Sequence, residues 1–228
     1  MNKVTLSGIL LAALTMAGCG DRAKSSNNDQ TQAATETAKT DSASKKIVLF
    51  FGDSLTAGYG LDDPADAFPG VISRRVDSLK LPYKVINAGL SGETTAGGNG
   101  RIDWLLKEKI DVFVLELGAN DGLRGIPVSE TAKNLQSIVD KVKAKYPDAK
   151  LVLLGMQVPP NMGADYTGKF KNIFPDLAKK NNMDLVPFLL QGVGGVPSLN
   201  QGDGIHPTAQ GAKIVANNVW AVLQDELK

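Results

Sequence analysis

From about residue 45 to the C-terminus, apolar runs alternate with stretches of helical spacing. Five continuous apolar runs, the last of them the weakest, predict buried strands at residues 47–51, 83–87, 112–117, 151–156 and 185–187. The segments between and after them predict helices at residues 69–79, 100–109, 130–145, 166–181 and 207–226. The last helix has one apolar stripe, formed by Ile214, Val215, Val219 and Leu223. This alternation predicts a doubly wound α/β fold, in which a parallel sheet is covered on both faces through right-handed crossovers.

The first residues of the chain have a different pattern. A short basic start leads into a mostly apolar segment, residues 4–17, and the small residues Ala17 and Gly18 directly precede Cys19. The apolar segment is too short for a comfortable membrane span and suits an export signal. It resembles a bacterial lipoprotein signal, in which the cysteine is lipidated and becomes the mature N-terminus, although Met16 replaces the usual leucine. The alternative is an ordinary signal peptide that is cut nearby, with Cys19 incidental.

Residues 20–44 contain no aromatic residue and no Val, Ile or Leu. Such a segment cannot bury enough apolar surface to offset the entropy of ordering, so it is expected to be a flexible tether. The sequence therefore predicts a lipoprotein-type signal at residues 1–19, a tether at 20–44 and one folded domain at 45–228. We expect a lipid-anchored protein of the bacterial cell envelope, and the position of Asp21 favours the outer membrane, facing the periplasm.

Composition narrows the possible partners. The net charge of +1 argues against nucleic acid, because neutralising phosphates requires a basic stripe. One His and one Cys cannot form the clusters that zinc or copper favour, and only a carboxylate site for Mg²⁺ or Ca²⁺ stays open. The glycines of residues 92–98 have phosphate-loop spacing, but no Lys-Ser or Lys-Thr pair follows, so nucleotide binding is a weak alternative. The spacing of acids and glycine that marks a calcium loop is absent, so no metal site is predicted.

The candidate chemistry lies in two short segments. His206 is the only histidine and lies in the segment 203–207 (DGIHP), while Ser54 follows the first apolar run in the segment 52–55 (GDSL). A serine hydroxyl needs a base to become a nucleophile, so any serine–histidine chemistry must use His206. Asp203 is the candidate that would orient the imidazole. We expect Pro207 to begin the last helix and to hold His206 in an extended conformation.

The candidate residues follow different predicted strands. Ser54 comes after the first strand, Gly89 after the second, Asn120 after the third, and Asp203 with His206 after the fifth. The carboxyl ends of parallel strands share one edge of the sheet, where ligands bind. Each short motif is weak by itself, but their convergence on one edge predicts an active site.

These blocks together resemble the SGNH (GDSL) hydrolases, a family named after Ser, Gly, Asn and His, here Ser54, Gly89, Asn120 and His206. The resemblance covers nearly all of residues 45–228. The segments 117–125 and 203–207 are most similar to a bacterial subgroup of multifunctional acyl-CoA thioesterases, lysophospholipases and arylesterases. The resemblance implies a flavodoxin-like, three-layer α/β/α fold with a five-stranded parallel sheet and no cofactor. The Gly-x-Ser-x-Gly elbow of α/β-hydrolases is absent, because Thr56 stands at its second glycine.

The resemblance also implies a mechanism. Ser54 would attack the acyl carbonyl of an ester or thioester, with His206 as base and Asp203 orienting it. The oxyanion would be bound by the backbone N–H groups of Ser54 and Gly89 and by the side-chain amide of Asn120. Two alternatives stay open: a deacetylase of an envelope glycan, and a non-catalytic envelope binding lipoprotein. A monomer is expected.

Neighbouring residues have supporting roles in this interpretation. Asp53 and Asp121 are expected to hold their turns through backbone hydrogen bonds. Apolar residues of the loops at this edge form either an acyl groove or ordinary loop packing, and they are Leu123, Ile126, Val158, Pro159 and Met162.

Overall fold

The structure, a computed structural model, describes residues 45–228. The predicted export signal, Cys19 and the predicted tether lie outside these residues. The sheet has five parallel strands in the order β2-β1-β3-β4-β5. Their bounds are β1 (Lys46–Gly52), β2 (Tyr83–Gly89), β3 (Val112–Glu116), β4 (Lys150–Leu154) and β5 (Asp184–Val186). The predicted five-stranded parallel sheet is confirmed.

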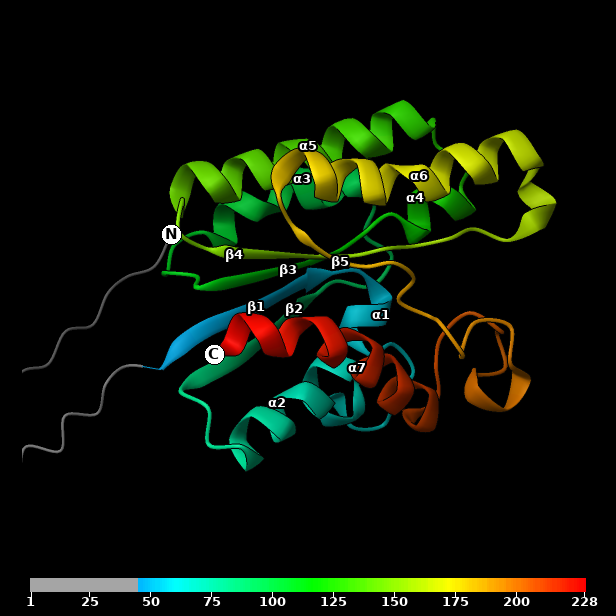
Figure 1. Cartoon of the computed structure of the whole chain (residues 1–228). Coiled ribbons are helices and arrows are strands. Elements are labelled where there is room, and N and C mark those ends of the chain that lie inside the picture. The colour runs from blue at the N-terminus through cyan, green and yellow to red at the C-terminus, as the bar shows by residue number, and fades with distance from the viewer. Residues whose placement is uncertain (1–44) are drawn as a thin grey trace, which may run out of the picture. The chain divides into compact units, whose positions relative to one another are not determined.

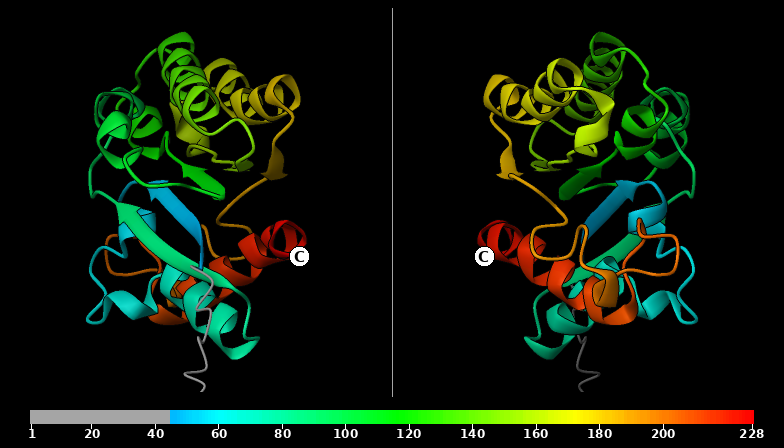
Figure 2. Two further views of the ribbon diagram at one scale, coloured as in Figure 1. Left: turned by 90° about the vertical axis from the view of Figure 1, so that its left-hand side faces the viewer. Right: turned by 90° about the vertical axis from the view of Figure 1, so that its right-hand side faces the viewer.

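Helices cover both faces of this sheet, as Figures 1 and 2 show. One face is covered by α3 (Thr95–Leu105), α5 (Val128–Lys145) and α6 (Ala164–Asn181). The opposite face is covered by α2 (Phe68–Ser78) and α7 (Ala209–Leu223). The short helices α1 (Ser54–Ala57) and α4 (Ala119–Leu123) follow β1 and β3. The four 3₁₀ turns of residues 45–228 are Pro64–Asp66, Pro160–Met162, Pro197–Leu199 and Gln224–Leu227. The three-layer α/β/α fold is therefore confirmed.

Helix α3 begins five residues earlier than the predicted range of 100–109. The Thr94 side chain caps its first turn, and the Asp121 carboxylate accepts the first helical N–H at 2.8 Å. Gly98 faces the sheet, where a Cβ atom would lie 2.5 Å from the Leu117 side chain. Close packing of the helix on the sheet therefore requires a residue without a side chain at Gly98.

The core lies on both faces of the sheet, around strands β1, β3 and β4. Phe50, Phe51 and Phe113 are fully buried, as are the aliphatic residues of β3 and β4 on either face. Because β1 is paired with both β2 and β3, the chain leaves β1 at the point where the strand order reverses. Gly52, the last residue of β1, is in register with Gly89 and Glu116, so three strands end together at this switch point.

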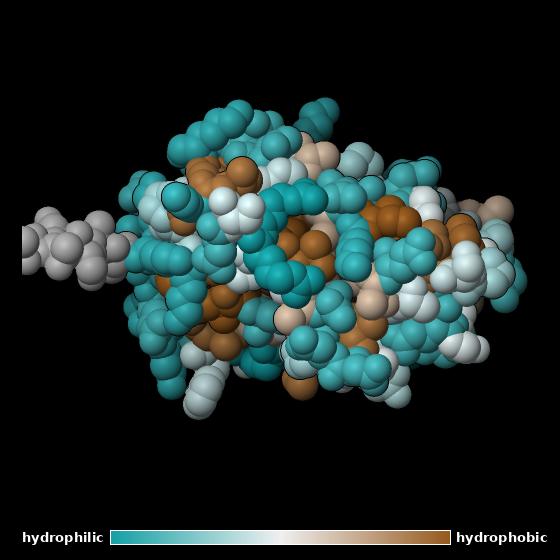
Figure 3. Space-filling model, turned by 90° about the horizontal axis from the view of Figure 1, so that it is seen from below, coloured by the Kyte–Doolittle hydropathy of each residue, from teal (hydrophilic) through white to brown (hydrophobic). Residues whose placement is uncertain are grey.

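The outer surface is mixed in character. Seen from the side of α2 and α7, hydrophobic side chains reach the surface in separate patches among hydrophilic ones (Figure 3). Within residues 45–228, no helix combines the length and apolar character needed to cross a membrane.

Candidate active site

Ser54, His206 and Asp203 form a continuous hydrogen-bonded chain. Ser54 Oγ lies 2.8 Å from Nε2 of His206, and Nδ1 of His206 lies 2.6 Å from Oδ2 of Asp203. Ser54 is the first residue of α1, and the other two lie in the loop before α7. The structure thus brings together a nucleophile, a base within reach of its proton and a carboxylate that orients the base.

The Asp203 carboxylate is held by its own loop. Its Oδ1 accepts hydrogen bonds from the backbone N–H groups of Ile205 (2.9 Å) and His206 (3.0 Å). The hydrogen bond from the His206 ring and these backbone bonds lower the pKa of Asp203 to about 2. Asp203 is therefore ionised at neutral pH and accepts the Nδ1–H of His206, which leaves Nε2 free to act as a base.

Pro207 does not begin the last helix, contrary to the sequence-based prediction. Helix α7 starts at Ala209, and the side chain of Thr208 caps it by accepting the Gly211 N–H at 3.2 Å. Pro207 instead pairs with Asn200 in an isolated antiparallel bridge. The bridge places His206 beside the mouth of the site.

Asp53 and Glu116 anchor the turn that carries Ser54. Asp53 Oδ1 accepts the Leu55 N–H at 3.0 Å and so caps α1, as the sequence predicted for a turn-holding residue. Glu116 Oε2 accepts the Asp53 N–H at 3.1 Å and the Thr56 hydroxyl at 2.8 Å. Sequence reasoning missed Glu116. The sequence feature that could have identified Glu116 is a carboxylate at the end of a continuous apolar run, because a charged side chain is costly to bury there without a function.

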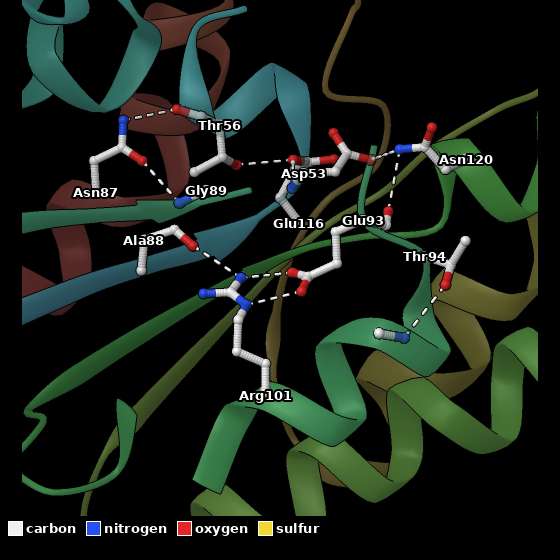
Figure 4. Close-up of polar contacts among 11 residues, drawn as sticks. Asp53, Thr56, Asn87, Ala88, Gly89, Glu93, Thr94, Arg101, Glu116 and Asn120 are labelled. Carbon is white, nitrogen blue, oxygen red and sulfur yellow. Dashed lines mark hydrogen bonds and ion pairs between the residues drawn. The ribbon is translucent and has the colours of Figure 1, made fainter. Parts of the chain in front are cut away.

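The side-chain amide of Asn120 is held by two hydrogen bonds, one of them to Asp53. Its Nδ2 donates to Asp53 Oδ2 and to the Glu93 carbonyl oxygen, both at 3.1 Å (Figure 4). These two contacts engage both amide hydrogens and fix the side chain at the wall of the cavity beside Ser54. Asp121, the next residue, holds the start of α3 rather than its own turn, because its carboxylate accepts the Thr95 backbone N–H.

The structure contradicts the assignment of Gly89 as an oxyanion donor. The Gly89 N–H is engaged by Asn87 Oδ1 at 2.9 Å (Figure 4), and a Cβ atom at Gly89 would lie 2.2 Å from the Ala57 backbone nitrogen. The absence of a side chain at Gly89 therefore allows β2 to pack closely against α1. Gly92, three residues later, lines the cavity with Ser54 and has a positive φ of 80°.

An ion pair holds the loop that carries Gly92. The Glu93 carboxylate is almost fully buried and binds the Arg101 guanidinium with two hydrogen bonds (Figure 4). Arg101 also donates to the Ala88 carbonyl oxygen at 3.0 Å, and its guanidinium lies 4.4 Å from the centroid of the Phe51 ring. The ion pair thereby ties the Gly92–Glu93 backbone to β2 and to the core.

A cavity of about 710 Å³ opens beside Ser54 and His206. Of the apolar residues predicted for the groove, Leu123, Val158 and Pro159 line the cavity, whereas Ile126 and Met162 do not. Sequence reasoning missed several lining residues, notably Met156, Pro160, Phe188, Leu190 and Ile205. A larger groove of about 1200 Å³ lies between α5 and α6, away from the three residues of the hydrogen-bonded chain. Across residues 45–228, no three His, Cys, Asp or Glu side chains gather as a group that could hold a metal ion.

Comparison with known proteins agrees with this geometry. The sequence model of the GDSL-like Lipase/Acylhydrolase family matches residues 50–214. The chain is 40% identical over 186 residues to Esterase TesA of Pseudomonas aeruginosa, an alignment that covers 81% of this chain and 91% of that protein. It is 37% identical over 183 residues to the Thioesterase 1/protease 1/lysophospholipase L1 of Escherichia coli, with 80% and 84% covered.

Among solved structures, the psychrotrophic esterase EstA from Pseudoalteromonas sp., inhibited by monoethylphosphonate, superimposes with a TM-score of 0.74. The two chains are 31% identical, and the match covers 79% of this chain and 98% of that one. The fold is thus shared with an enzyme named as an esterase.

Proposed function

Because this chain belongs to the GDSL-like lipase/acylhydrolase family and is an ester-hydrolysing enzyme, we propose that it cleaves carboxylic esters and thioesters through an acyl-enzyme on Ser54. One observation carries the proposal. The chain of Ser54, His206 and Asp203, with distances of 2.8 Å and 2.6 Å, lies at an apolar cavity large enough for an acyl chain.

In the first half of the reaction, Ser54 Oγ forms a bond to the acyl carbonyl carbon while Nε2 of His206 takes the hydroxyl proton. The ionised Asp203 carboxylate stabilises the imidazolium and keeps its ring in place. The same Nε2–H then protonates the leaving alcohol or thiol as its bond to carbon breaks. In the second half, Nε2 of His206 takes a proton from a water molecule, whose oxygen forms a bond to the acyl carbon. The bond from that carbon to Ser54 Oγ then breaks, the acid leaves, and Nε2 returns the proton to Oγ.

The oxyanion of the tetrahedral intermediate needs donors beside Ser54. We assign this role to the backbone N–H groups of Ser54 and Gly92 and to the amide of Asn120, which all line the cavity. Gly92 replaces Gly89 in this set because Gly92 lines the cavity, whereas Gly89 does not line it and its N–H is bound to Asn87. One Asn120 amide hydrogen would then be shared between the oxyanion and the atom that it binds in this structure, Asp53 Oδ2 or the Glu93 carbonyl oxygen.

The lining of the cavity favours a lipid-like acyl group over a sugar. Leu123, Met156, Val158 and Phe188 present apolar side chains, whereas a glycan would need polar partners for its hydroxyl groups. This feature favours acyl esters and thioesters over the deacetylation of an envelope glycan. The complete hydrogen-bonded chain from Ser54 to Asp203 argues against a binding protein without activity, because binding alone does not need it.

We further propose that the enzyme is a monomer, lipid-anchored through Cys19 in the cell envelope, most favourably at the outer membrane facing the periplasm. The support for the lipid anchor comes from the basic start, the apolar segment and the small residues before Cys19, and the position of Asp21 favours the outer membrane.

The experiment that tests the proposed activity combines labelling with a substrate panel. A fluorophosphonate probe should label Ser54 stoichiometrically, as located by peptide mass spectrometry. Aryl esters, acyl-CoAs, lysophospholipids and acetylated sugars would then be compared by kcat/KM. Labelling of another serine, or a preference for acetylated sugars, would overturn the proposal.

A further inference from the structure

Two carboxylic acids lie side by side directly behind the nucleophile. Asp53 precedes Ser54, and Glu116 is the last residue of the neighbouring strand β3; both are 0% exposed. The two residues are in direct contact, because the Asp53 backbone N–H donates to Glu116 Oε2 at 3.1 Å. Among the described residues, no Lys or Arg forms an ion pair with either acid, because the nearby Arg101 is engaged by Glu93.

The groups that face the pair are mostly neutral. Thr56 comes from α1 and Asn120 from α4, and both donate hydrogen bonds to the pair. The carboxylate of Glu93, on the loop before α3, is turned to Arg101, and Asp121 is bound by Thr95. Burial is the largest cause that raises the pKa of both carboxyl groups. Two adjacent charges without a cation are too costly here, so the pair retains one proton.

The hydrogen-bond partners locate this proton. Both Asp53 oxygens already accept a hydrogen bond, Oδ1 from Leu55 N–H and Oδ2 from Asn120 Nδ2. Glu116 Oε2 accepts two, from Asp53 N–H and from the Thr56 hydroxyl. Glu116 Oε1 is buried without any donor. It is the one oxygen of the pair that accepts no hydrogen bond, so a proton on Oε1 competes with no donor and gives this buried atom a partner.

We propose that Glu116 is a positioning residue that carries a proton on Oε1 and donates it as a hydrogen bond to the Asp53 carboxylate. Glu116 thereby holds Asp53 as an acceptor for both Leu55 N–H and Asn120 Nδ2. Through these two contacts it sets the turn of Ser54 and the position of the Asn120 amide (Figure 4). The catalytic part of this inference rests on the proposed function, in which Ser54 and Asn120 act on the acyl group.

The proposal predicts opposite outcomes for two amide substitutions of nearly equal size. In Glu116→Gln, the amide oxygen replaces Oε2 and the amide nitrogen donates to Asp53, so every contact is retained. In Asp53→Asn, one oxygen replaces two acceptors, so either Leu55 N–H or the Asn120 amide loses its partner. We expect kcat of Glu116→Gln within about threefold of the wild type, and kcat of Asp53→Asn lower by roughly 10²-fold with KM little changed.

Infrared spectroscopy observes the proton directly. At about pH 8, where exposed carboxyl groups are ionised, the wild type should show the carbonyl stretch of a protonated carboxylic acid. Glu116→Gln should lack this band. A residue with a purely structural role would not produce such a signal. A wild type without the band would overturn the proposal even if neither variant folds, and so would a band that persists in Glu116→Gln.

The comparison of kcat between Glu116→Gln and Asp53→Asn is a second test of the proposal. Equal losses of kcat in Glu116→Gln and Asp53→Asn, for folded proteins of similar thermal midpoint, would also overturn the proposal. Fluorophosphonate labelling of Ser54 in the wild type separates this failure from a failure of the proposed function. If Ser54 is not labelled, the assigned nucleophile is wrong, whereas the infrared result still reports on the buried pair.

Discussion

The Tyr59 ring lies against the imidazole of His206, with the two ring centroids 4.7 Å apart and the planes tilted by 45°. The Tyr59 ring covers one face of the imidazole at the mouth of the cavity, and Tyr59 itself remains 54% exposed to solvent. Gln201 ties the two segments together, because its Nε2 donates to the carbonyl oxygens of Tyr59 (2.7 Å) and Pro207 (3.0 Å). The imidazole is therefore held by a ring contact as well as by its bond to Asp203.

We predict that the ring of Tyr59, and not its hydroxyl group, supports His206. Tyr59→Phe should leave kcat/KM on an aryl ester close to the wild-type value. Tyr59→Ala should lower it by roughly 2- to 10-fold, the range expected for one aromatic contact. Steady-state kinetics of both variants, with their thermal midpoints as control, decide between the two groups. A loss in Tyr59→Phe equal to that in Tyr59→Ala would assign the effect to the hydroxyl group.

Ser54 and His206 should act as one unit. Ser54→Ala and His206→Ala should each lower turnover by roughly 10⁴- to 10⁶-fold, and the double variant should be little worse. The reason is that neither group activates the substrate without the other. Initial rates of the three variants on an aryl ester test this expectation. Activity that survives in Ser54→Ala would show that the nucleophile lies elsewhere.

Asn120→Ala should lower kcat by about 10²- to 10³-fold with little change in KM, because an oxyanion exists only in the transition state. The same change removes the hydrogen bonds to Asp53 and to the Glu93 carbonyl, so stability must be measured beside the kinetics. Both kcat and the thermal midpoint should be determined. A nearly normal kcat with a lowered midpoint would make Asn120 a residue that only holds the loops together.

Gly89, the last residue of β2, and Gly92, in the loop after it, offer a matched comparison. Gly89→Ala should lower the thermal midpoint strongly, because the new methyl group would meet the Ala57 backbone at 2.2 Å. Gly92→Ala has open space for the methyl group, but its positive φ of 80° is strained for alanine. We expect this variant to fold and to lose kcat by at least about 10-fold as its N–H shifts. The opposite result, a folded Gly89→Ala with low kcat and an active Gly92→Ala, would restore Gly89 as the donor.

Cys19→Ser should move the protein from the membrane fraction to the soluble fraction. The reason is that stable anchoring needs two or more acyl chains, and serine at this position cannot receive the lipid. Kinetic constants on small esters should not change, because every residue of the proposed active site lies within residues 45–228. Fractionation and the intact mass of the mature wild type provide the measurement. A mature mass without lipid would refute the anchor.

The strands and the members of the serine–histidine chain were accessible from the sequence because the signals for them are local. A continuous apolar run such as 47–51 predicts a buried strand without knowledge of its neighbours. Parallel strands share one edge, so residues that directly follow them converge even when 152 positions separate Ser54 from His206. A single histidine left no second candidate for the base, and Asp203 lay within the same turn.

The remaining features depend on contacts between segments that the sequence does not relate. Gly89 and Gly92 lie three residues apart, at and just after the end of β2. Only the path of the loop shows that the Gly89 N–H is engaged by Asn87 and that Gly92 lines the cavity. Glu116 reads as the end of a strand until the sheet register sets it beside Asp53.

The start of α3 likewise depends on the packing of Gly98 against Leu117. Periodicity and short motifs therefore determined the elements and the reacting groups, since both are encoded over a few neighbouring residues. Tertiary structure alone decided which backbone donors, buried acids and apolar walls surround those groups, since their hydrogen bonds and burial arise only when distant segments pack together.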